Sequence, residues 1–84
     1  MSMDRTVRDG FLNTVVEQIA SGNPPAVRAT RDRLVSQGLS EAEAAQMIAI
    51  VLRNEMKQMI SESRSFDDVR FEGMLNQLPT LPQA

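Results

Sequence analysis

Apolar residues recur along this chain at helical spacing. In the first such stretch, Val7, Phe11, Val15 and Ile19 follow one another every four residues, which is the period of one helix face. The pattern predicts four helices, over approximately residues 6–21, 24–37, 41–61 and 67–78. No segment shows the alternation that is typical of a strand. The predicted fold class is therefore all-α, a small bundle of four helices.

The third predicted helix, 41–61, is apolar over more of its circumference than one neighbouring helix could cover. Six residues form a broad apolar arc on it: Ala45, Ile48, Ala49, Leu52, Met56 and Met59. Polar residues such as Gln46, Arg53 and Lys57 share the other side. A helix with this distribution has to pack against several neighbours. The third helix is therefore predicted to be the central element of the bundle.

Two helix starts are marked by local sequence. Asn23 is the predicted N-cap of the second helix, and Pro24 its first residue, because the missing N–H of proline would be unpaired there. Asp67 is the predicted N-cap of the fourth helix. Phe66 and Phe71 stand at the two positions of a hydrophobic staple around it.

The junction between the second and third helices carries the clearest signals in the chain. Gly38 is expected to end the second helix in a left-handed conformation, which glycine adopts at little cost. Leu34 and Leu39 fall at the contact positions of a Schellman motif. Ser40 and Glu43 then have the spacing of a capping box at the start of the third helix.

A chain of 84 residues is expected to fold as one small domain. We predict a flexible N-terminus over 1–5, a single helical domain over 6–78, and an extended or disordered tail over 79–84. The longest nearly unbroken apolar run, 44–52, is less than half the length needed to cross a bilayer. A cytoplasmic location without a membrane partner is expected.

Composition restricts the chemistry that the chain could perform. It contains no histidine, cysteine, tyrosine or tryptophan. Acid–base catalysis would therefore depend on carboxylates, Lys57 or a serine. The usual metal site of a helical bundle, which pairs glutamate with histidine, cannot form without histidine. We expect neither an enzyme nor a bound cofactor or metal. Glu55 is expected to meet a basic neighbour or to flank the core.

Nucleic-acid binding is disfavoured by charge. The net charge is −2, whereas binding by phosphate neutralisation needs a basic surface. Residues 33–47 have the outline of a helix-turn-helix, but Glu41 and Glu43 stand where a recognition helix would approach DNA. The helix before them carries Arg28, Arg31 and Arg33. Arg28 is expected to pair with Asp32 one turn later. The stem of Arg31 is expected to pack on the apolar stripe, while its charged head extends to solvent or pairs with a carboxylate.

Two sets of residues are candidates for contact with other molecules. Met47 and Ile50 lie outside the apolar arc of the third helix, so a neighbouring helix covers them or they form a contact with a protein partner or a second copy. Asn13, Glu17 and Gln46 form a candidate polar cluster. Asn13 and Glu17 lie opposite the apolar stripe of the first helix, which favours an ordinary solvent face.

The chain resembles an uncharacterised family of small bacterial α-helical proteins. The resemblance is carried by the order of short motifs: Glu17-x-Ile19, Asn23-Pro24-Pro25-x-Val27, Arg33-Leu34, Gly38-Leu39-Ser40, Glu43-Ala44, Ile48, Val51-Leu52, Glu55, Phe66-Asp67, Leu75 and Leu78-Pro79. It implies a compact helical fold and no assigned activity. It also implies histidines near positions 13 and 46, which here are Asn13 and Gln46, so a metal or acid–base role does not carry over.

The function that these observations favour is a small protein-interaction or self-association module without catalytic activity. Two alternatives stay open. One is a helix-turn-helix-like regulator that associates with nucleic acid. The other is a ligand binder or enzyme that uses carboxylates and arginines, which a pocket lined by Arg31 together with a buried glutamate would favour.

Overall fold

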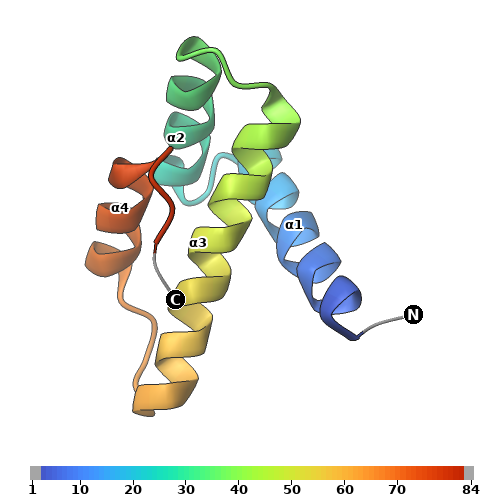
Figure 1. Ribbon diagram of the computed structural model, residues 1–84. Helices are drawn as coiled ribbons and strands as arrows, with labels where there is room; N and C mark the ends of the chain where they lie inside the picture. Colours follow the sequence, from blue (N-terminus) through green and yellow to red (C-terminus); the bar gives the residue numbers. More distant parts are fainter. Residues whose placement is uncertain (1–2, 83–84) are drawn as a thin grey trace.

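The computed structural model describes residues 3–82, which form four helices and no strand (Figure 1). The helices are α1 (Met3–Ser21), α2 (Pro25–Ser36), α3 (Glu41–Glu62) and α4 (Asp68–Gln77). This confirms the predicted fold class. α1 begins three residues before its predicted start at residue 6. The predictions for residues 1, 2, 83 and 84 lie outside the described residues.

α3 is the central element of the bundle, as predicted. It contacts each of the other three helices, and α2 also contacts α1 and α4. Figure 1 shows α1 on one side of α3 and the α2–α4 pair on the other. Within residues 3–82, α1 and α4 do not contact one another. α3 therefore packs against helices on both sides and supplies apolar side chains to each.

The core lies along α3 and is built from aliphatic side chains and one phenylalanine. Its buried apolar members are Val15, Val27, Leu34, Ala44, Ala45, Ile48, Ala49, Val51, Leu52, Phe71, Leu75 and Leu78. Thr30 is buried among them, and its hydroxyl donates to the carbonyl of Ala26 at 2.7 Å. That bond satisfies a polar group which would otherwise be costly to bury.

The apolar arc predicted for α3 was partly wrong. Met56 and Met59 are only partly buried, whereas Ala44, Val51 and Glu55 are fully buried. The reason is that α3 is covered from two directions. A single arc describes only one of the two faces that α3 buries.

The junction between α2 and α3 follows the sequence prediction closely. Gly38 has φ +104°. The N–H of Leu39 donates to the carbonyl of Leu34 at 3.1 Å, and that of Gly38 to the carbonyl of Val35 at 3.0 Å. These two bonds define a Schellman motif, and they satisfy carbonyls that the helix end leaves free.

The predicted start of α2 was wrong by one residue. Pro24, not Asn23, occupies the N-cap position, and Pro25 is the first helical residue. The residue before a proline is driven out of the helical region by steric conflict with the proline ring. Because Pro24 precedes Pro25, it is held extended, with φ −74° and ψ 149°.

The predicted starts of α3 and α4 are confirmed. The N–H of Glu43 donates to the hydroxyl of Ser40 at 3.0 Å, and the N–H of Ser40 donates to the carboxylate of Glu43 at 2.9 Å. The carboxylate of Asp67 accepts from the backbone N–H three residues later. The rings of Phe66 and Phe71 meet edge to face, with centroids 5.2 Å apart. Each end is thus held by local contacts.

Replacement of two glycines by alanine should have opposite effects on stability. An added Cβ meets nothing within 4 Å at Gly38 or at Gly73. The change in stability at each position is therefore set by the backbone conformation. Gly38→Ala should destabilise by about 1–2 kcal/mol, because L-residues disfavour positive φ. Gly73→Ala, inside α4, should stabilise by about 0.5–1 kcal/mol. Urea denaturation followed by circular dichroism measures both. An equal loss in the two variants would contradict the left-handed turn.

Candidate functional site

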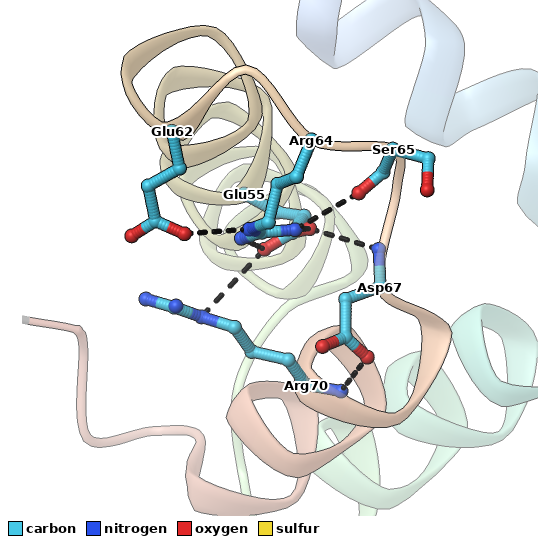
Figure 2. A network of polar contacts seen from close by, with 6 residues as sticks. All are labelled: Glu55, Glu62, Arg64, Ser65, Asp67 and Arg70. Carbon is cyan, nitrogen blue, oxygen red and sulfur yellow. Dashed lines mark hydrogen bonds and ion pairs between the residues drawn. The ribbon is translucent and has the colours of Figure 1, made fainter.

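Glu55 is a carboxylate buried inside the bundle. It lies on the face of α3 that meets α4, and none of its surface is exposed. α3 ends at Glu62, and Ser63, with φ 51°, reverses the chain. The segment that follows returns along α3, so that Arg64 reaches back to Glu55 (Figure 2). The chain reversal at the end of α3 thus brings the guanidinium of Arg64 to the buried carboxylate of Glu55, two turns earlier in the helix.

Both oxygens of the Glu55 carboxylate are occupied. Arg64 donates to it through two nitrogens, Nη1 to Oε2 at 2.7 Å and Nη2 to Oε1 at 3.0 Å. The backbone N–H of Asp67 donates to Oε2 at 3.0 Å. Nε of Arg70 lies 3.7 Å from Oε1. A paired arrangement of this kind is the strong form of the arginine–carboxylate interaction.

The guanidinium of Arg64 is shared between two carboxylates. Its Nε donates to Glu62 at 2.7 Å, and its Nη1 also donates to the carbonyl of Ser65 at 3.0 Å. Figure 2 shows Arg64 between Glu62 and Glu55, with Arg70 approaching from α4. The network therefore joins the last turns of α3, the linker and the first turn of α4.

The environment keeps Glu55 ionised. The hydrogen bonds from Arg64 lower the pKa of the Glu55 carboxyl, and burial opposes this effect. The Asp67 N–H and the positive charges of Arg64 and Arg70 lower the pKa further. The same pairing, chiefly with Glu55, raises the pKa of the Arg64 guanidinium. With both oxygens bound to donors, this carboxylate connects α3 to the linker and to the start of α4.

A basic neighbour was predicted for Glu55 as one of two alternatives, but neither the identity of Arg64 nor the complete burial of Glu55 was predicted. A usable signal was present, because Glu55 lies seven residues after Ile48 and four after Val51, both fully buried. Those spacings place the three residues on one helix face. Arg64 could not be found this way, since it lies beyond the end of α3.

Two arginines of α2 bind the carboxyl-terminal ends of other helices. Arg28 donates to the carbonyls of Ile19 and Ala20 at 2.9 and 2.8 Å. These carbonyls belong to the last turn of α1, where the helix leaves them without internal partners and where a cation is favourable. The predicted pairing of Arg28 with Asp32 was wrong.

Arg33 performs the same task for α4. It donates to the carbonyls of Leu75 and Leu78 at 2.9 and 2.8 Å. Both atoms lie more than forty positions away in sequence, so local sequence gives no sign of the contact. α2 therefore holds the ends of two helices that do not contact each other.

A surface hollow opens where α1, α2 and the start of α3 meet. It is lined by Val16, Ile19, Arg31, Glu41, Ala42 and Ala45, and its volume is about 240 Å³. Arg31 spans its edge: Nε is 2.6 Å from Asp32, and Nη1 is 3.3 Å from Glu41. This confirms the predicted carboxylate partner of Arg31. Glu55, the buried glutamate, does not line the hollow.

The candidate residues from the sequence lie apart from these features. Met47 is partly buried against the core, and Ile50 is exposed. Asn13, Glu17 and Gln46 are all exposed. In the described part of the chain, no hydrogen bond or ion pair joins any two of these three, so the structure gives no further support to a polar cluster.

The chain matches no protein-family model, no curated protein and no solved structure. Within residues 3–82, no group of three or more acidic side chains is arranged to hold a metal ion. In the same range, no helix combines the length and the apolar character needed to cross a membrane. The fold and the site define a small helical-bundle protein.

Replacement of Glu55 should be far more costly than replacement of its neighbour in the network. Glu55→Gln keeps the size but places an amide N–H₂ against the donors of Arg64 and Asp67. We expect a loss of about 2 kcal/mol and a fall in Tm of roughly 10 °C. Glu62→Gln removes a more exposed partner of the same arginine and should cost less than about 1 kcal/mol. Thermal and urea denaturation measure both, and equal costs would argue against the central role of Glu55.

The contribution of Glu55 should depend on pH. Its pKa in the folded protein lies below the ordinary 4.5, so the unfolded chain binds its proton first as pH falls. The stabilisation is then fully present above pH 4.5 and is lost as pH falls through the folded pKa. The difference in unfolding free energy between wild type and Glu55→Gln should shrink as pH falls below about 5 and through the folded pKa of Glu55. A constant difference across this range would contradict the prediction.

Proposed function

We propose that this protein works by associating with another polypeptide, a partner protein or a second copy of itself, without catalysing a reaction. The proposal includes the cytoplasmic location expected from the sequence. The resemblance to small bacterial helical proteins is consistent with it and assigns no activity. Association is the function that the arrangement of exposed and buried side chains supports best.

The observation that carries the proposal is the position of Ile50. Residues at helical spacing along α3, namely Glu43, Gln46, Ile50, Arg53 and Lys57, are all exposed. They form an open face, defined here by those five residues. Ile50 is the large apolar residue among them, and 41% of its surface is exposed. Ile60, three residues beyond Lys57, continues the same spacing and is 79% exposed. Partly buried Met47 lies three residues away, at the spacing that places side chains together.

The rival functions have less support. The buried carboxylate of Glu55 is fully engaged by Arg64 and Asp67, which leaves it poorly suited to acid–base catalysis. Arg28 and Arg33 are both bound to helix-end carbonyls. A nucleic-acid surface needs cations that are free to meet phosphates, so the basic cluster of α2 is a weak candidate for one.

A charge placed on the open face should abolish the association. Val35 on α2 is the matched control, since it is similarly exposed, at 38% against 41% for Ile50. If the partner is a second copy, sedimentation should show a wild-type dimer. Ile50→Lys should then raise its Kd by more than about tenfold, a cost near 1.4 kcal/mol, and Val35→Lys should leave it unchanged.

The hetero-association version has its own readout. A protein captured from native lysate by wild type should be lost with Ile50→Lys and kept with Val35→Lys. Circular dichroism establishes that both variants are folded. The proposal would be contradicted if the wild type stays monomeric at high concentration and also captures no protein whose binding is lost with Ile50→Lys.

A further inference from the structure

We propose that the hollow between α1, α2 and α3 is a docking site for a basic, apolar segment of a partner protein. An apolar side chain of that segment would enter the hollow, and a lysine or arginine next to it would meet the carboxylates at its edge. This inference rests on the proposed function, because it names the class of partner. It concerns a different surface from Ile50.

The shape of the hollow suits a single side chain. Ala42 and Ala45 form part of its wall, and their small side chains leave the space unfilled. Its volume is about 240 Å³, and it is open to solvent. Val16, another lining residue, is half exposed. Pockets that take one buried anchor residue are typical centres of binding energy in protein interfaces.

The walls belong to three different helices, which are held together by other contacts. Arg31 connects α2 to Glu41 of α3 across the edge of the hollow. Arg28 fixes the end of α1 against α2. The site is thus formed before a partner arrives, which lowers the entropic cost of binding.

Charge decides which partner fits. Arg31 and Glu41 line the hollow, and Asp32 is paired with Arg31 beside it. The side chain of Arg31 is 22% exposed, whereas those of Asp32 and Glu41 are 62% and 77% exposed. This ion-paired group of one positive and two negative charges is net negative, and its carboxylates are its more exposed part. Complementary charge favours a basic segment and opposes an acidic one.

The test uses two short helical peptides that differ only in charge, one of leucine and lysine and the other of leucine and glutamate. Each is titrated into the ¹⁵N-labelled full chain and followed by amide chemical shifts. We expect the lysine peptide to shift the amides of Val16, Ile19, Ala42 and Ala45. The glutamate peptide should leave them unchanged.

Two pairs of variants separate shape from charge. Ala42→Phe fills the hollow, and Ala29→Phe places the same ring at another exposed alanine, on α2 and outside the lining. Glu41→Lys reverses the charge at the edge, and Glu72→Lys makes the same change on the exposed surface of α4. We expect Ala42→Phe and Glu41→Lys to raise the Kd for the lysine peptide by at least about tenfold. Their controls should bind it as wild type does.

Three results would overturn the inference: no binding of the lysine peptide, equal binding by Ala42→Phe, or shifts confined to the open face of α3. Concentration-dependent shifts at the hollow without peptide would assign it to a second copy of the chain instead. The proposed function is tested separately, by the effect of Ile50→Lys on association. If Ile50→Lys abolishes the association and Ala42→Phe leaves it intact, the proposed function stands and only the docking-site inference is contradicted.

Discussion

The carboxylate of Glu55 carries a full charge in a position that solvent does not reach. An uncompensated charge there would cost several kcal/mol, so the surrounding chain has to supply donors. It does so with the two nitrogens of Arg64 and the N–H of Asp67. These contacts fix the path of the linker after α3. They place α4 where Phe71, Leu75 and Leu78 complete the core.

The arginines of α2 solve a related problem at the helix ends. The last turns of α1 and α4 contain no basic residue of their own, so their carbonyls lack a local cation. Arg28 and Arg33 supply one to each from a neighbouring helix. In sequence these residues read as a basic cluster. In the folded chain their guanidinium groups are bound to helix-end carbonyls, and the more exposed charges beside Arg31 are the carboxylates of Asp32 and Glu41.

The surface features that could bind other molecules follow from the same packing. The bundle covers α3 from two directions and leaves the open face uncovered, with Ile50 among polar residues. At the start of α3, small alanines leave a hollow between three helices. These are the two surfaces on which the proposed association and the proposed docking site rest.

The amino-acid sequence determined the features that depend on neighbouring residues. The number and type of the helices, the left-handed Gly38, the capping box at Ser40 and the staple between Phe66 and Phe71 all follow from local sterics and hydrogen bonding. Each of these was predictable because the interacting groups lie within a few positions of one another. The start of α2 is also local: Pro25 holds Pro24 in an extended conformation, which moves the N-cap from the predicted Asn23 to Pro24.

The long-range partners of Arg28, Arg33 and Arg64 were decided by tertiary structure. Arg33 reaches carbonyls more than forty positions away, and Arg64 reaches Glu55 only because the chain reverses at Ser63. The same holds for the hollow, whose walls come from three helices. A periodic pattern tells which face of a helix is apolar. It does not tell which helix covers that face, because long-range pairing depends on how all the helices pack at once.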